Sequence, residues 1–339
     1  MCAPEGLRRE DVDPAQFLTA PRVTIVAGKG GVGKTTVSAA LGLAASRCGL
    51  RALIIDVEGK SGLPVLFGRS QLEYDELVLV PADPDKGWGE LRARTLSADA
   101  ALVEYLREHG MQRISARLAS SGALDMVATA TPGIKDVLVL GKVKQIERSG
   151  VADVIILDGH AAGHAITFLK SAAGLLDAVR VGPIQTQARE VQDLLTDASR
   201  CQVVLVTLPE ETPVNELVET AFSLEDDIGI KLGPVVVNGL YPILDGLKID
   251  PQAAADEIGA SLRPGEADQM RAAAGFRLAR TELQIGQVAR LGRELPLGQL
   301  HLPFLFNSDL RRTDLDLLAD TLLEAIADLP AVDIGGAPS

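Results

Sequence analysis

The sequence has few cysteines, few basic side chains relative to acidic ones, and no long apolar segment. Its three cysteines, Cys2, Cys48 and Cys201, are widely separated and odd in number. This excludes a disulfide framework and a CxxC metal clasp, and it fits a reducing, cytoplasmic location. There are 33 Lys and Arg against 46 Asp and Glu, a net charge of −13. So acidic a chain is a poor candidate for binding nucleic acid, and no nucleic-acid partner is expected.

The chain also lacks any stretch of about 18 consecutive apolar residues, so no integral membrane segment is expected and any membrane role would be peripheral. Its first 20 residues carry several charges but no apolar core, which argues against a signal peptide. We expect residues 1–21 to form an N-terminal extension and residues 22–330 to form one domain. Residues 331–339, which end in GGAPS, are expected to be a disordered tail.

What the sequence does contain is a series of short apolar runs bounded by turn residues. They lie at 23–27, 53–55, 154–157, 203–206 and 235–237. Runs that are short, rich in β-branched residues and without polar alternation are typical of strands buried on both faces of a parallel sheet. Helical spacing after the first run predicts a strand–helix–strand crossover. The sequence therefore predicts a doubly wound α/β fold with a mainly parallel sheet.

Two longer segments, about 89–150 and about 245–298, interrupt this alternation. In the first, apolar residues recur at helical spacing over 98–106 and 134–146. In the second, helix-start signals precede a long Arg-rich stretch that is expected to be helical to about Leu291. We expect both insertions to be mainly helical and to pack as a helical subdomain over one end of the sheet.

A glycine-rich loop, GKGGVGKTT, follows the first apolar run and matches G-x-x-x-x-G-K-[ST] between a strand and a helix. Its glycines let backbone amides turn inward around a phosphate, and the next helix adds its positive N-terminus. Lys34 is expected to reach the β and γ phosphates, and the Thr35 hydroxyl to ligate Mg²⁺. The residues expected to contact ATP or ADP here are Gly28, Lys29, Gly30, Gly31, Val32, Gly33, Lys34, Thr35 and Thr36.

Polar residues follow other strands of the expected sheet. Because the carboxyl ends of parallel strands meet at one edge, Asp56, Asp158 and Asn238 should converge on Gly28. Simpler interpretations stay open for each: the aspartates can cap loops, and Asn238 precedes a glycine in a turn-forming pair. On spacing alone, Lys29 can equally be a solvated surface charge.

Three segments together resemble a known family. GKGGVGKTT, LIIDVEGKSGL at 53–63 and DGHAAGHAITFL at 158–169 are similar to the deviant-Walker P-loop ATPases, in the branch of the arsenite-pump ATPase and the tail-anchored-protein targeting ATPase. The third segment parallels the family pattern DTAPTGHT and keeps Asp158, Gly163 and His164. TPGIKDVL, VTLPEETPV, VVVNGLYP and LHLPFLF resemble family segments in the same order, so the resemblance covers about residues 22–329.

The resemblance implies a role for each matching residue near the phosphates. Lys29 matches the signature lysine that crosses a dimer interface to the partner's nucleotide, and Lys34 is the second catalytic lysine of the loop. Asp56 matches the switch I aspartate that positions and activates the attacking water on the Mg²⁺ side. Asp158 is expected to hold Mg²⁺ through water, beside Thr35.

Further residues match the family's base-binding and signalling positions. Asn238 matches an asparagine that contacts adenine, and the segment around Pro303 and Phe304 matches the loop that covers the base. His164 lies where switch II begins. The resemblance thus implies that nucleotide is held from three separate parts of the chain.

The sequence departs from the family pattern at both switches. Switch I keeps only Asp56 of DPAHS, continuing as Val57 to Lys60, and switch II has Gly159 to Ala162 where the family has TAPT. Communication of the nucleotide state can therefore differ while hydrolysis remains. The paired cysteines that bind zinc, or arsenite and antimonite, are missing, so neither metal is expected. Only Met111, Met126 and Met270 are available for a Met-rich client groove of the targeting type.

These observations lead to one function and one alternative. The resemblance implies an ATP-hydrolysing, Mg²⁺-dependent dimeric switch in the cytoplasm that couples nucleotide state to a client or partner protein. The dimer is expected to be a homodimer or a heterodimer with a related ATPase chain, and the sequence does not identify the client. The alternative is a weakly hydrolysing, nucleotide-binding subunit of such a heterodimer with a regulatory role.

Overall fold

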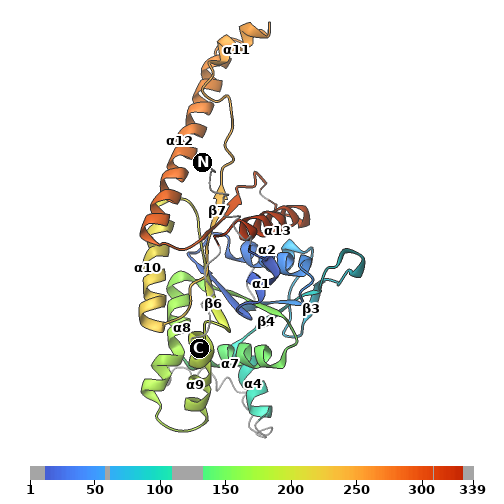
Figure 1. Cartoon of the computed structure of the whole chain (residues 1–339), viewed down its shortest axis with the longest axis vertical. Helices are drawn as coiled ribbons and strands as arrows, with labels where there is room; N and C mark the ends of the chain where they lie inside the picture. Colours follow the sequence, from blue (N-terminus) through green and yellow to red (C-terminus); the bar gives the residue numbers. More distant parts are fainter. Residues whose placement is uncertain (1–11, 58–61, 109–132, 308, 331–339) are drawn as a thin grey trace, which may run out of the picture.

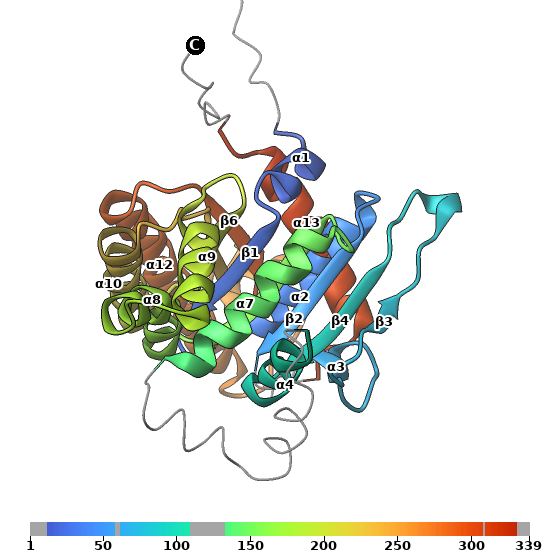
Figure 2. The same ribbon diagram turned by 90° about the horizontal axis from the view of Figure 1, so that it is seen from below.

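The sheet of the computed structural model, which describes residues 12–57, 62–108, 133–307 and 309–330, has eight strands in the order β3-β4-β2-β5-β1-β6-β7-β8. The strands are β1 (Val23–Gly28), β2 (Ala52–Val57), β3 (Leu77–Val80), β4 (Leu91–Leu96), β5 (Val154–Ala161), β6 (Cys201–Thr207), β7 (Val235–Leu240) and β8 (Gln299–Pro303). All neighbours are parallel except β3 and β4, which form an antiparallel pair at one edge (Figure 2). The predicted mainly parallel α/β fold is confirmed.

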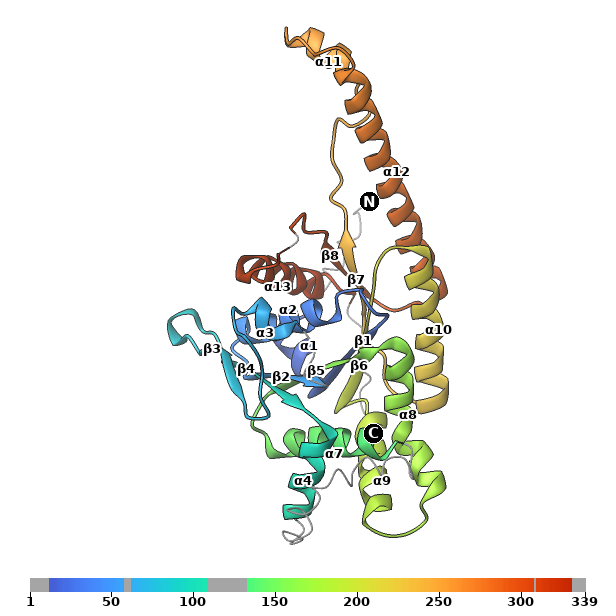
Figure 3. The same ribbon diagram turned by 180° about the vertical axis from the view of Figure 1, so that it is seen from behind.

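Helices cover both faces of this sheet (Figure 3). They are α1 (Pro14–Thr19), α2 (Lys34–Arg47), α3 (Leu63–Leu66), α4 (Ala98–Glu108), α7 (Ile134–Ser149), α8 (Ala162–Ala178), α9 (Pro183–Thr196), α10 (Glu211–Ile228), α11 (Pro251–Glu257), α12 (Glu266–Glu294) and α13 (Arg312–Ala327), with a 3₁₀ turn η1 (Pro84–Lys86). The helices α2 and α13 lie over one face, and α7 to α10 lie over the other.

The central strands are buried on both faces, as their unalternating apolar runs predicted. On β1, Ile25 belongs to the apolar cluster that contains α7 to α10, while Val26 belongs to the cluster that contains α2 and α13. These two side chains are 2% and 0% exposed. Burial of apolar surface contributes about 25 cal/mol per Å². Two-sided burial therefore stabilises the strands whose carboxyl ends carry the site.

Three strands, β3, β4 and β8, were not predicted from the sequence. Within residues 89–150, α4 and α7 are helices as expected, but β4 is a strand. Its sequence LRARTL alternates apolar residues with arginines rather than forming a continuous apolar run. Arg92 compensates by pairing with Glu76 at 2.5 Å and with Glu90 at 3.7 Å. β8 alternates in the same way, with exposed His301 between two buried leucines. Strands near a sheet edge tolerate this polar alternation, which weakens the sequence signal.

The two expected insertions do not form one helical layer. α4 packs on α7, which itself lies in the helical layer on the sheet, whereas α12 packs on α10, α11 and β7. Figure 1 shows α4 and α11 at opposite ends of the molecule. We call residues 241–294 the arm, because α12 runs from the body of the protein to α11 at its far end. The first insertion stays on the sheet because its helix α7 leads directly into β5 and buries Val137 and Leu140 in the apolar cluster that covers this face.

The described part of the N-terminal extension, residues 12–21, packs against the body of the protein. α1 packs on α13, and Leu18 is 5% exposed within the cluster that contains α2. The expected tail at 331–339, together with Met111 and Met126, lies outside the described residues. In the described part of the chain, no helix combines the length and apolar character needed to cross a membrane. The limits of the predicted domain remain a prediction.

Candidate nucleotide site

The glycine loop links the end of β1 to the start of α2, in the strand–loop–helix context that the sequence predicted. Gly31 and Gly33 have φ of +86° and +93°, in the left-handed region that favours glycine. A Cβ on Gly33 would lie 2.3 Å from Nδ2 of Asn238, and one on Gly28 would lie 2.4 Å from the Val206 carbonyl oxygen. Close packing of the loop against β6 and β7 therefore requires glycine at positions 28 and 33.

Lys34 folds back over this loop. Its Nζ donates a hydrogen bond to the carbonyl oxygen of Lys29 at 3.0 Å. Burial lowers the pKa of Lys34 below its ordinary value, and the nearby negative charge of Asp158 opposes that shift. An ammonium group that is partly removed from water, close to the inward-facing loop, is well suited to bind an anion.

Asp158 lies at the centre of the polar cluster. It is 4% exposed, and its two carboxylate oxygens accept hydrogen bonds from the hydroxyls of Thr35 at 2.8 Å and Ser38 at 3.1 Å. Burial raises the pKa of Asp158 to about 6; the Thr35 hydrogen bond opposes the shift and the charge of Asp56 adds to it. Ser38 was not singled out in the sequence, although it lies one helical turn beyond Lys34.

Asp56 supplies the second carboxylate. It lies near the end of β2, is 3% exposed, and is the direct cross-strand partner of Asp158 on β5. The expected convergence of the two strand ends is therefore seen in the structure. Two buried carboxylates on adjacent strands repel each other unless a proton or a cation lies between them.

The residues gathered here fit Mg²⁺ and a nucleotide phosphate. Mg²⁺ prefers oxygen ligands, and Thr35, Asp56 and Asp158 bring hydroxyl and carboxylate oxygens to one place. Space beside the loop is open, since a Cβ on Gly30 or Gly31 would meet no atom within 4 Å. The N-terminus of α2 adds a positive dipole at the same point.

The expected base-binding residues lie on the β7 and β8 side of the loop. Nδ2 of Asn238 donates to the Val32 carbonyl oxygen at 2.9 Å, which places this side chain against the loop. Pro303 ends β8, and the amide of Phe304 donates to the Leu240 carbonyl oxygen at 2.7 Å. The Phe304 segment thus lies next to the strand that carries Asn238.

The Phe304 ring belongs to an aromatic group that sequence reasoning missed. Its centroid lies 4.9 Å from those of both Tyr241 and Phe306, and the Arg277 guanidinium lies 4.2 Å from the centroid of Tyr241. Phe306 is 69% exposed. These residues come from three distant segments, so no spacing in the sequence could have connected them.

Lys29 does not lie with Lys34 over the loop. Its Nζ forms an ion pair with Oε1 of Glu216 on α10 at 2.5 Å, and both side chains are 39% exposed. The sequence contained no sign of this partner, which is 187 residues away.

The departures from the family's switch sequences are only partly visible. Residues 58–61 and the side chains of residues 160–163 lie outside the described part of the structure. Within that part, His164 is exposed near the start of α8. A Cβ on Gly159 would lie 2.7 Å from the Val26 carbonyl oxygen, so the close approach of β1 explains why this departure is a glycine.

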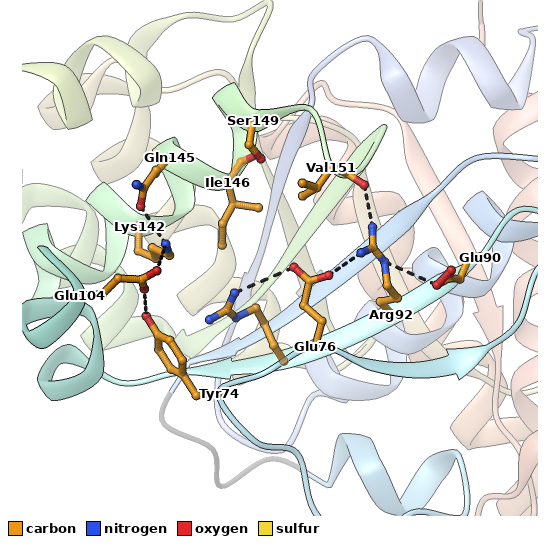
Figure 4. Close-up of polar contacts among 11 residues, drawn as sticks. Tyr74, Glu76, Glu90, Arg92, Glu104, Lys142, Gln145, Ile146, Ser149 and Val151 are labelled. Carbon is orange, nitrogen blue, oxygen red and sulfur yellow. Dashed lines mark hydrogen bonds and ion pairs between the residues drawn. The ribbon is translucent and has the colours of Figure 1, made fainter. Parts of the chain in front are cut away.

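A second polar cluster joins the segment after α3 to helices α4 and α7 (Figure 4). Glu104 accepts a hydrogen bond from the Tyr74 hydroxyl, and it pairs with Lys142 at 2.7 Å. Lys142 also donates to Gln145 at 2.8 Å. This cluster fixes α4 against α7 and the loop that leads into β3. Tyr74, Glu104 and Lys142 are 30 or more residues apart in the sequence, and sequence reasoning did not identify them.

A buried parallel sheet, a glycine loop that begins a helix, and carboxylates at adjacent strand ends define a P-loop nucleotide-binding protein. Residues 21–181 match the family model described as anion-transporting ATPase. The chain is 33% identical over 260 residues to ATPase BagA of Mycobacterium tuberculosis, covering 73% of this chain and 74% of that protein. It is 31% identical over 144 residues to ATPase get3 of Schizosaccharomyces japonicus, covering 42% of each. The chain belongs to the ArsA/Get family of P-loop ATPases, which confirms the resemblance.

Proposed function

We propose that this chain is a Mg²⁺-dependent ATPase that acts as a dimeric molecular switch in the cytoplasm. The observation that carries the proposal is the convergence of Lys34, Thr35, Asp56 and Asp158 around one glycine loop. An inactive relative would not need to keep two buried carboxylates next to each other, because each costs free energy when ionised away from water.

The chain's own residues divide the work of hydrolysis. Loop amides and Lys34 bind the β and γ phosphates, and Thr35 and Asp158 are the residues that would hold Mg²⁺. Bound Mg²⁺ neutralises charge on the phosphate oxygens. Asp56 orients a water molecule and accepts its proton as the water oxygen bonds to the γ phosphorus. The bond from that phosphorus to the bridging oxygen breaks, which gives ADP and phosphate.

Asn238, Pro303 and Phe304 form the proposed adenine side of the site. Asn238 supports this role because its side chain already contacts the loop. Phe304 supports it because its ring is 39% exposed beside the same strand. An amide that can both donate and accept hydrogen bonds suits the edge of a purine, and an aromatic ring suits its face.

A client or partner protein would most simply bind the arm. Ile243, Ile258 and Phe276 of the arm are 76%, 79% and 73% exposed. Large apolar side chains that are this exposed are candidates for protein interaction surfaces when they gather in a patch. The chemistry of the site does not identify the client.

The test uses two inactive variants of the proposed dimer. If each ATP is held by its own protomer's Asp56 but needs Lys29 of the partner, homodimers of Lys29→Ala and of Asp56→Asn should both be nearly inactive. A mixed dimer has one site with both residues intact. Random exchange makes about half of the dimers mixed, so about a quarter of wild-type activity should return.

Subunit exchange is verified separately, with fluorescently labelled chains. Activity equal to the sum of the two inactive proteins, despite full exchange, would show that Lys29 does not act across a dimer. If the natural partner is a related chain, the same pair of variants is tested with that chain.

A further inference from the structure

The ion pair of Lys29 joins two elements of different rigidity. Glu216 lies in the second turn of α10, and its neighbours Val214 and Leu217 are 1% and 4% exposed in the core. Lys29 lies in the loop between Gly28 and Gly30, and a Cβ on Gly30 would meet nothing within 4 Å. The carboxylate is therefore presented by a fixed helix, while the ammonium is on a segment with space around it.

This contact competes with the role proposed for Lys29. A lysine ammonium is a compact point charge, and it cannot hold a carboxylate of its own chain while it reaches the phosphates bound by another chain. Both ligands are anionic oxygens, so one can replace the other. With both side chains 39% exposed, the pair is expected to be weak and exchangeable rather than a permanent link.

We propose that Glu216 is a positioning residue that holds Lys29 within its own protomer until a nucleotide phosphate of the partner replaces the carboxylate. This proposal rests on the dimeric ATPase proposed above. Release of Lys29 is then part of the cost of forming the dimer, and only a bound triphosphate in the partner compensates it. Glu216 thereby limits dimer formation when nucleotide is scarce.

The expected size of the effect follows from the exposure of the pair. An exposed ion pair of this kind changes an equilibrium by about twofold to fivefold. A two-fold symmetric dimer must release two copies of Lys29, so the factors multiply. Removal of the Glu216 charge should therefore lower the dissociation constant of the ATP-bound dimer by about 4-fold to 25-fold.

The experiment compares three full-length proteins: wild type, Glu216→Gln and Glu219→Gln. Glu219 is exposed and lies on the same helix, so its substitution removes the same charge without touching Lys29. Sedimentation velocity across a range of protein concentrations, with Mg²⁺ and a non-hydrolysable ATP analogue, gives each dissociation constant. We expect a 4-fold to 25-fold decrease for Glu216→Gln and less than a twofold change for Glu219→Gln.

Without nucleotide, Glu216→Gln should dimerise no better than wild type, because the phosphate that attracts the released Lys29 is absent. An equal effect of the two variants, or tightening without nucleotide, would show a general charge effect and overturn the role of Glu216. If wild type dimerises and Glu216→Gln dimerises equally well or more weakly, the role of Glu216 is wrong, whereas the dimeric switch itself is not affected. If neither protein dimerises with the analogue, the proposed homodimeric form of the switch is wrong as well.

Discussion

The strand ends next to the glycine loop contain buried carboxylates, whereas the arm carries exposed apolar side chains. Both arrangements are the reverse of the usual one, in which charged side chains are exposed and apolar ones are buried. At the loop, Asp56 and Asp158 are charged groups with 3% and 4% exposure. On the arm, Ile258 and Phe276 are apolar groups with 79% and 73% exposure. Buried charge is costly and exposed apolar surface is unused for folding, so neither is explained by stability. Under the proposed function, the buried carboxylates at the loop serve hydrolysis and the exposed apolar side chains of the arm serve association with a partner.

The largest expected effect tests the loop. Lys34→Ala should abolish tight binding of Mg-ATP, raising its dissociation constant by about 100-fold or more, because a partly desolvated ammonium that faces the phosphates is lost. Isothermal titration calorimetry measures this constant. Lys248→Ala on the exposed arm is the matched control and should leave the constant unchanged. Equal affinities for wild type and Lys34→Ala would refute the nucleotide site.

The second prediction sharpens the contrast within the arm itself, because α12 is anchored at one end only. Leu291 is 0% exposed against the sheet, and Leu291→Ala should lower the free energy of unfolding by about 2 to 5 kcal/mol. Phe276→Ala, on the exposed part of the same helix, should change it by less than about 0.5 kcal/mol. Urea unfolding of both variants gives the two values. A large loss for Phe276→Ala would mean that the exposed part of the arm contributes to folding.

The smallest predicted effect concerns the pH dependence caused by Asp158. Its pKa of about 6 in the folded protein lies above the ordinary value of 3.8, so the folded state binds the proton more tightly. The stability contributed by that proton is fully present below pH 4 and is lost as the pH rises through about 6. Relative to Asp158→Asn, wild type should therefore lose about 1.4 kcal/mol of unfolding free energy between pH 5 and pH 8.

Urea unfolding of both proteins at the two pH values, without Mg²⁺ or nucleotide, measures this difference. Asp153→Asn serves as the control, because its hydrogen bond to Arg51 lowers the pKa of Asp153, which then does not titrate in this window. A difference between wild type and Asp158→Asn that is the same at pH 5 and pH 8 would show that Asp158 is ionised throughout.

The sequence predicted the five central strands because burial on both faces leaves a continuous apolar run. It did not predict β4, whose arginines are neutralised by acids from other segments, such as Glu76. Such compensation depends on tertiary contacts, which composition and periodicity do not show. The helix α7 was predicted correctly as a helix, but its place in the layer on the sheet depends on the crossover into β5.

In the site, the residues predicted from the sequence are those that lie in one short motif or directly after a recognisable strand. The loop and its lysines lie within nine consecutive residues, and Asp56 and Asp158 follow recognisable strands. Glu216 and Arg277 were missed because each is brought to its partner from a distant helix. Tyr241 was missed because its contacts are with Arg277, Phe304 and Phe306, which lie in distant segments. Whether the predicted residues bind Mg²⁺ and nucleotide stays a prediction that the experiments above address.

The beginning of α10 contacts both regions of the comparison. Glu216 pairs with Lys29 of the loop, Glu210 just before the helix pairs with Arg280 of α12, and Arg290 donates to the Glu211 carbonyl oxygen at 3.3 Å. α12 has 29 residues, which at 1.5 Å per residue is about 43 Å. A tilt of about 5° at its anchored end would move its far end by about 4 Å. Because α12 is long and is attached at one end, a small shift of α10 next to the glycine loop would produce a much larger displacement at the far end of the arm.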